Sequence, residues 1–215
     1  MSDQQSLFLV SRTCTRKQEN AADECCSLEG FRELPAYVLL GDPGAGKTES
    51  FKREAIESDG KYIRARDFST FDPRDEYKNK TLFIDGLDEM RADGGDGRTP
   101  LDHIRKHLDR LGRSRFRLSC READWLGTSD AEALKSVSPD GQIIALHLNP
   151  LSNEDIAEIL RHKKTVSDPD SFIHQATEHG LADLLRNPQT LKLLVDAVGG
   201  DTWPQSRTQV YEMAC

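Results

Sequence analysis

One stretch of thirteen residues constrains this chain more than any other. Residues 36–48 read AYVLLGDPGAGKT: an apolar run, a glycine-rich turn, and Lys47-Thr48 at the start of a helical segment that continues to Glu57. The spacing Gly-x-x-x-x-Gly-Lys-Thr over residues 41–48 is that of a phosphate-binding loop. It predicts a buried strand, a loop and a helix, with a nucleoside di- or triphosphate bound at the turn.

The residue types in this loop suit contact with phosphate groups. Glycines let the backbone turn so that successive N–H groups point at phosphate oxygens, and the helix N-terminus adds partial positive charge. Lys47 is placed to reach the outer phosphates, and the Thr48 hydroxyl to ligate Mg²⁺. The alternative is a glycine-rich connector that binds nothing. The residues predicted to contact the nucleotide are Gly41, Asp42, Pro43, Gly44, Ala45, Gly46, Lys47, Thr48 and Glu49.

A second informative stretch is Thr81-Leu-Phe-Ile-Asp-Gly-Leu-Asp-Glu89, an apolar strand that ends in acidic residues. Asp85 would lie at the carboxyl end of a buried strand, where ligands bind in open α/β sheets, and can hold Mg²⁺ beside Thr48. Asp88 and Glu89 follow at a distance suited to orienting or deprotonating a water, and we expect Glu89 to be nearer that water. The alternative is an ordinary strand followed by an acidic turn.

Two further groups of side chains, arginines and histidines, are candidate site residues. Arg121 ends the strand-like segment 113–121 and is predicted to sense the γ-phosphate, whereas Arg113, Arg115 and Arg117 are interpreted as surface charge. His103 and His107 are spaced i, i+4 on a predicted helix. With no third ligand evident, a solvated helix face is favoured over a metal site.

The remaining pattern predicts an α/β domain followed by helices. Strand-like and helical segments alternate, which indicates a parallel five-stranded sheet sandwiched by helices, the fold of a P-loop NTPase. We expect a lead-in over residues 1–34, a nucleotide-binding domain over 35–150 and a small all-α domain over 151–215. The predicted strands are residues 36–40, 60–66, 81–85, 113–121 and 142–148.

Several local predictions concern the ends of these segments. The lead-in should contain a strand or turn at residues 7–10 and then a helix, and residues 91–99 should form a surface loop. Ser152 and Asp155 suggest a capping box, and Gly199-Gly200 a helix end. A helix beginning at Ser206 has no terminator. This predicts that the chain is a fragment of a longer protein.

Composition narrows the classes of function. The net charge of −8 argues against broad nucleic-acid binding, which needs a basic surface. Apolar runs reach only about five residues, far short of a membrane span, and the start lacks the basic flank of a signal peptide, so we expect a cytoplasmic protein. Five cysteines without C-x-x-C spacing are expected to be reduced thiols.

The order of these motifs resembles the NACHT-type branch of the STAND signal-transduction ATPases, within the AAA+-like group. The likeness rests on the phosphate loop, on Leu-Phe-Ile-Asp-Gly-Leu-Asp-Glu at residues 82–89, on Ser-Cys-Arg at 119–121 and on Asn187-Pro188. It implies that Gly86 is the small residue after the Mg²⁺-binding aspartate, that Arg121 is the family's arginine, and that Pro188 lies against adenine.

The resemblance also implies a function. Such a protein binds ATP or ADP with Mg²⁺, hydrolyses ATP slowly, and uses its nucleotide state to control domain arrangement and homo-oligomerisation of the full-length protein, here in microbial defence or stress signalling. The family normally continues with a winged-helix domain and a repeat-rich sensor, for which residues 200–215 are too few.

Three other functions are alternatives to an ATPase switch. A small-molecule or nucleotide kinase needs an acceptor site and a basic lid, which Asp88 and Glu89 do not explain. A GTPase needs Asn-Lys-x-Asp, but Asn79-Lys80 is followed by Thr81-Leu82. A module in which the nucleotide is only structural is disfavoured by the intact lysine and acidic residues.

Overall fold

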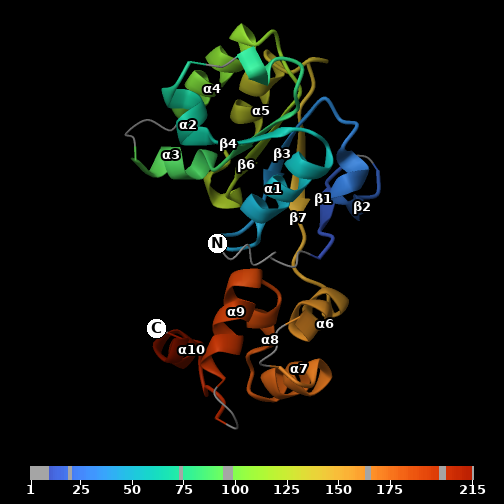
Figure 1. The fold of residues 1–215 in the computed structure, drawn as a ribbon, viewed down its shortest axis with the longest axis vertical. Coiled ribbons are helices and arrows are strands. Elements are labelled where there is room, and N and C mark those ends of the chain that lie inside the picture. Colours follow the sequence, from blue (N-terminus) through green and yellow to red (C-terminus); the bar gives the residue numbers. More distant parts are fainter. Residues whose placement is uncertain are drawn as a thin grey trace, which may run out of the picture. The chain divides into compact units, whose positions relative to one another are not determined.

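The structure is a computed structural model that describes residues 10–18, 21–72, 75–93, 99–162, 166–198 and 202–214. The chain divides into two compact units. The larger, the α/β unit, holds residues 13–43 and 47–149, and the smaller, the helical unit, holds the described parts of 1–12, 44–46 and 150–215 (Figure 1).

The α/β unit is built on a seven-stranded sheet with the order β2-β1-β7-β3-β6-β5-β4. All five predicted strands are present, and they run parallel to their neighbours among themselves. They are β3 (Ala36–Leu40), β4 (Lys61–Arg64), β5 (Leu82–Asp85), β6 (Phe116–Cys120) and β7 (Ile144–Leu148).

The prediction of a five-stranded, purely parallel sheet is wrong, because two more strands join it. β1 (Thr13–Arg16) and β2 (Glu24–Ser27) form an antiparallel hairpin, and β1 also pairs antiparallel with β7. The lead-in therefore contains a hairpin and a short 3-10 helix, η1 (Leu28–Phe31), in place of the predicted helix. Cys14 in β1 is fully buried, although the two strands are otherwise polar and partly exposed.

Helices cover both faces of this sheet (Figure 1). On one face Phe51 of α1 packs edge-on against Phe83 of β5, with ring centroids 5.5 Å apart. On the other face, Ile104 and Leu108 of α4 lie in a core with alternate residues of the strands, such as Ile84. The helices are α1 (Lys47–Glu57), α2 (Ala65–Thr70), α3 (Leu87–Asp93), α4 (Thr99–Arg110) and α5 (Thr128–Lys135), with 3-10 turns η2 (Asp75–Tyr77) and η3 (Glu122–Asp124).

The helical unit has its own apolar core and well-defined helix starts. The predicted capping box is confirmed: the Ser152 N–H donates to Asp155 Oδ2 (2.9 Å) and the Asp155 N–H to Ser152 Oγ (3.1 Å). Asn187 caps the helix that begins at Pro188. The helices are α6 (Asn153–His162), α7 (Pro169–Glu178), α8 (Ala182–Leu185), α9 (Pro188–Ala197) and α10 (Arg207–Ala214). The segments 7–9 and 199–200 lie outside the described residues.

Two side chains that were interpreted as solvated are buried. His107 is 7% exposed, because its ring packs edge-on against Phe68 and its Nδ1 lies 2.6 Å from the Phe68 carbonyl oxygen. Arg117 is 2% exposed and its guanidinium lies 4.5 Å from the ring centroid of Tyr37. The predicted loop 91–99 is wrong at both ends, since α3 continues to Asp93 and α4 begins at Thr99; residues 94–98 lie outside the described residues.

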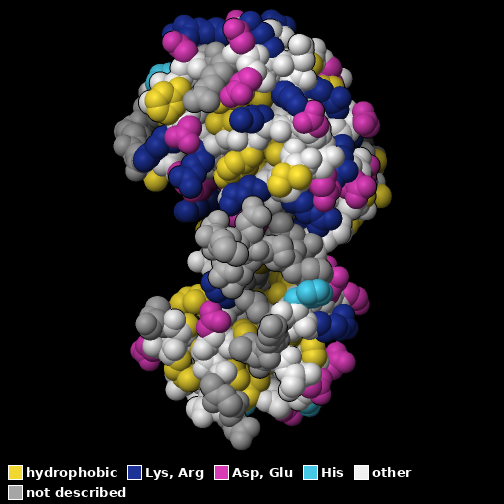
Figure 2. All heavy atoms as spheres, viewed as in Figure 1, with side chains coloured by type: hydrophobic (Ala, Val, Ile, Leu, Met, Phe, Trp, Pro, Cys, Tyr) yellow, Lys and Arg dark blue, Asp and Glu magenta, His cyan; other side chains and the backbone are white. Residues whose placement is uncertain are grey.

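The remaining features concern surface charge and the length of the helices. Basic and acidic side chains are intermixed on the face of the α/β unit that Figure 2 shows. Within the described ranges, every helix is too short or too polar to cross a bilayer.

Candidate functional site

The predicted site residues of the α/β unit gather where the parallel strands end. The glycine-rich loop (residues 41–48) follows β3, Asp85 ends β5 and Arg121 follows β6. Strand order decides their arrangement, because β6 lies between β3 and β5. The strand that carries Ser119, and that Arg121 follows, is therefore inserted between the loop and the acidic segment. The carboxyl end of such a sheet is where α/β proteins bind ligands.

The glycine-rich loop needs glycine at two positions. Gly44 and Gly46 have φ values of +72° and +98°, which are left-handed conformations that other residues rarely adopt. Lys47 then opens α1, and its Nζ donates to the carbonyl oxygens of Gly41 (2.7 Å) and Asp42 (3.0 Å). Its ammonium group is thus folded back over the loop.

The surroundings of Lys47 act on its charge in opposite directions. Burial lowers the pKa of Lys47 below its ordinary value, and the carboxylates of Asp88 and Asp85 oppose that shift. The buried Arg12 is also tied to the loop: its guanidinium donates to the Ala45 carbonyl oxygen at 2.6 Å. Sequence reasoning missed Arg12, because it lies in the lead-in without any motif.

Asp85 accepts hydrogen bonds from three hydroxyl groups. Thr48 Oγ1 and the Tyr62 phenol donate to Oδ2, at 2.8 and 3.0 Å, and Ser119 Oγ donates to Oδ1 at 2.5 Å. Ser119 Oγ in turn accepts the Gly86 N–H at 2.8 Å. Since Asp85 is only 9% exposed, these contacts fix the orientation of a buried carboxylate. Residues 48 and 85, from two separate motifs, meet directly.

The neighbouring acids Asp88 and Glu89 have different surroundings. Asp88 is 7% exposed and receives two bonds from Arg121, one from the side-chain Nε (2.7 Å) and one from the backbone N–H (3.2 Å). Glu89 is exposed and forms no hydrogen bond or ion pair with any other residue that the structure describes. Its carboxyl group lies over Gly86, where an added Cβ would come within 3.3 Å of the Glu89 carboxyl carbon.

The helix that carries these acids is anchored by a buried ion pair. Arg91 of α3 makes two bonds, of 2.8 and 2.9 Å, to the carboxylate of Asp130 in α5, and both side chains are less than a tenth exposed. Asp130 also accepts the Leu126 N–H (2.9 Å), and Arg91 donates to the Asp124 carbonyl oxygen. The segment after Arg121 is therefore tied to the helix that carries Asp88 and Glu89.

The oxygen atoms at this point are of the kind that Mg²⁺ prefers. A hydroxyl and a carboxylate, from Thr48 and Asp85, are hard donors, and Mg²⁺ is usually bound by one or two carboxylates plus waters and substrate phosphates. Among the described residues, no three His, Cys, Asp or Glu side chains converge. A Mg²⁺ site that is completed by phosphates does not need such a group.

The structure therefore assembles part of the predicted site. Lys47, Thr48, Asp85, Asp88 and Arg121 interact directly or through shared neighbours. Glu49 forms an ion pair with Lys52 on the surface of α1 (2.6 Å). Pro188 is the first residue of α9 in the helical unit, and its predicted contact with a base stays a prediction.

Ser119 and Tyr62 were missed, although both hold Asp85. The one available signal for Ser119 was its place two residues before Arg121, which puts it near the end of the strand. Tyr62 gave no signal, because an aromatic residue in a strand ordinarily indicates packing. Their role depends on which strands are neighbours.

Comparisons with known proteins do not place this chain in a family. A scan against family models and a search of curated proteins returned no match.

Proposed function

We propose that this protein binds Mg²⁺ and an adenine nucleotide at the glycine-rich loop and hydrolyses ATP slowly. The observation that carries this proposal is the contact of Thr48 Oγ1 with Asp85 Oδ2, at 2.8 Å. Two sequence motifs that are 37 residues apart bring together a hydroxyl and a carboxylate. P-loop NTPases use these two kinds of side chain as their protein ligands for Mg²⁺. A glycine-rich connector without a ligand would have no need of this pairing.

Each residue of the site has a role in this proposal. The loop N–H groups and Lys47 bind the phosphates, and Lys47 exchanges the carbonyl oxygens of Gly41 and Asp42 for phosphate oxygens. Thr48 and Asp85 would hold Mg²⁺, which when bound neutralises charge on the phosphates. Ser119 and Tyr62 keep the Asp85 carboxylate oriented.

Glu89 is the residue that best suits activation of water. A general base needs an available carboxylate that can accept a proton from the attacking water. Asp88 is occupied by Arg121, whereas Glu89 has no partner among the described residues. Arg121 is held beside this acidic pair and would bind the γ-phosphate, exchanging one anionic partner for another.

The wider function follows from the resemblance to NACHT-type STAND ATPases. In this proposal the nucleotide state switches the arrangement of domains and controls homo-oligomerisation in microbial defence or stress signalling. Pro188 would lie against adenine. The support is the motif order at residues 41–48, 82–89 and 119–121 together with the geometry of their side chains.

Thermal unfolding in the presence of nucleotides tests the binding site. A ligand at a hundred times its dissociation constant stabilises by about 2.7 kcal/mol, which for a chain of this size raises Tm by roughly 5–11 °C. We expect ATP and ADP with Mg²⁺ to produce this rise, GTP not to, and Lys47→Ala to abolish it. Lys106→Ala, an exposed lysine of α4, is the matched control and should retain the rise. An unchanged Tm with every nucleotide would contradict the proposal.

A further inference from the structure

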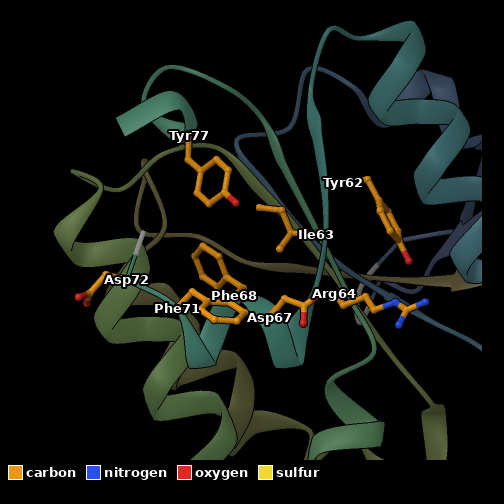
Figure 3. Close-up of a pocket in the computed structure, with 8 residues that line it drawn as sticks. All are labelled: Tyr62, Ile63, Arg64, Asp67, Phe68, Phe71, Asp72 and Tyr77. Atoms are coloured by element: carbon orange, nitrogen blue, oxygen red, sulfur yellow. The ribbon is translucent and has the colours of Figure 1, made fainter. Parts of the chain in front are cut away.

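A cavity lies in the α/β unit, beside the edge strand of the sheet. It has a volume of about 310 Å³ and is bounded by β4, α2 and the turn η2. This volume is at the lower end of the range for small-ligand sites. Its lining residues are Tyr62, Ile63, Arg64, Asp67, Phe68, Phe71, Asp72 and Tyr77 (Figure 3).

Aromatic rings form two opposite walls of this cavity. In Figure 3 the ring of Tyr77 lies on one side, and the rings of Phe68 and Phe71 lie on the other, with Ile63 between them. Phe68 is buried in the core at 2% exposure, but Phe71 is 62% exposed. Phe71 therefore presents a ring to solvent at the mouth of a cavity that is already aromatic. Such walls suit a flat group that stacks on rings.

Charge within the cavity favours a cation. Asp67, in the first turn of α2, is exposed, and its carboxylate forms no hydrogen bond or ion pair with any residue that the structure describes. Asp72 already pairs with Arg110 of α4 (3.0 Å). The one lining cation, Arg64, lies beside the Tyr62 hydroxyl, away from the aromatic walls. The carboxylate of Asp67 is thus the available charge at the aromatic walls.

We propose that this cavity binds a guanidinium group, either the arginine side chain of a peptide or a free guanidino compound. A guanidinium is planar, stacks on aromatic faces, and can form paired hydrogen bonds to one carboxylate. The rings of Phe71 and Tyr77 supply the stacking surfaces, and Asp67 supplies the carboxylate. A quaternary ammonium would use the rings alone, and a primary ammonium lacks the flat shape. Tyr62 lines this cavity and also holds Asp85, but the three residues proposed to bind the guanidinium, Asp67, Phe71 and Tyr77, have no role in the nucleotide site.

Isothermal titration with three cations tests this inference on the whole chain. The probes are N-acetyl-arginine amide, N-acetyl-lysine amide and tetramethylammonium. We expect the arginine amide to bind with a dissociation constant of roughly 1 mM, and the other two to bind at least about tenfold more weakly. Equal binding of all three, tighter binding of tetramethylammonium, or no saturable binding of the arginine amide would overturn the proposal.

Two substitutions assign the binding to this cavity. Asp67→Asn keeps the shape of the side chain and removes its charge, and should weaken binding of the arginine amide about tenfold or more, as expected for loss of a charged hydrogen bond. Phe71→Leu removes an exposed ring and should weaken it about threefold. The controls, Asp196→Asn in α9 and the exposed Ile56→Ala in α1, should bind as the unmodified chain does. Unchanged affinity in Asp67→Asn would refute the assignment.

A fourth titration separates the two sources of the guanidinium group. Free L-arginine carries a carboxylate and an ammonium that the blocked amide lacks. Tighter binding of the free amino acid would support the proposal with a free guanidino compound as ligand. Tighter binding of the blocked amide would support it with an arginine side chain of a peptide as ligand.

Discussion

Strand β6 and the residue directly after it carry arginines that look alike in the sequence and behave differently in the fold. Arg117, in the first half, donates to the carbonyl oxygens of Arg32, Pro35 and Phe116 at 2.8–3.1 Å, and burial lowers its pKa to about 10. Arg121, just beyond the carboxyl end, is 46% exposed and paired with Asp88. Carbonyl groups of the backbone are permanent partners, whereas a partly exposed arginine that pairs with one carboxylate can exchange it for phosphate. Position along a parallel strand therefore separates a structural arginine from a candidate ligand-binding one.

The largest effect should be the loss of stability when the buried Arg117 is replaced. Arg117→Ala removes a guanidinium that holds three backbone carbonyl oxygens, and buried acceptors without donors are costly. We expect the free energy of unfolding to fall by about 3–4 kcal/mol, measured by urea denaturation. Arg113→Ala, on the exposed turn before β6, should change it by less than about 0.5 kcal/mol. Equal losses of stability in the two variants would show that Arg117 has no special structural role.

ATP hydrolysis should depend most on Glu89, the acid without a partner among the described residues. Glu89→Gln should lower single-turnover hydrolysis of ATP by about a hundredfold, which is about 2.7 kcal/mol in the barrier. It should leave the free energy of unfolding nearly unchanged, because Glu89 is exposed. Asp88→Asn should lower hydrolysis less than Glu89→Gln does, because its main effect is to remove the ion pair that holds Arg121. Unchanged turnover in both amides would show that neither acid acts on water.

The exposed arginine should affect discrimination between nucleotides more than stability. Arg121→Gln should weaken ATP binding about tenfold relative to ADP, or about 1.4 kcal/mol, because only ATP offers a γ-phosphate. Titration calorimetry with both nucleotides measures the ratio, and Arg113→Gln is the control. If both nucleotides lost affinity equally, Arg121 would have a general role in the site and none as a sensor.

The smallest effect should be the pH dependence of Lys47. Since burial lowers its pKa, the folded protein binds fewer protons there than the unfolded chain between the lowered pKa and 10.5. In that window the contribution to the free energy of unfolding rises with pH. Nucleotide affinity should do the opposite and fall as the pH rises, because the positive charge that binds the phosphates is lost. Titrations of ADP at alkaline pH should show a shallower fall in Lys47→Arg, because arginine stays charged.

Sequence reasoning found the elements whose residue patterns are strong. The five buried strands are apolar or alternating, and the phosphate-loop and acidic motifs mark the ends of two of them. It missed the hairpin of β1 and β2, because Thr13–Arg16 and Glu24–Ser27 are short and polar and are paired only because β7 offers an edge. Hairpin strands of this kind have no apolar run to reveal them.

The same limit applies inside the site. Asp85 and Lys47 could be predicted, because each stands at a fixed place in a motif. Ser119 and Tyr62 could not, because their contacts with Asp85 arise from the strand order, which no local pattern records. Arg117 was misjudged because alternation with Arg113 and Arg115 suggests an outward face. In the fold, the segment between η1 and β3 supplies the carbonyl oxygens of Arg32 and Pro35, and Glu54 of α1 lies near enough to act on its charge.

The position of β7 has a consequence for synthesis of the chain. β7 pairs with both β3 and β1, and a Thr15–Asn149 hydrogen bond (2.8 Å) joins residues 134 positions apart. The hairpin and the strand before the glycine-rich loop thus have no shared neighbour until residue 148 has been made. Between the ends of β3 and β7 the ribosome adds about a hundred residues, which at roughly 5–20 residues per second takes on the order of 5–20 s. During this interval one side of β3 is an unpaired strand edge in the nascent chain, open to other extended chains.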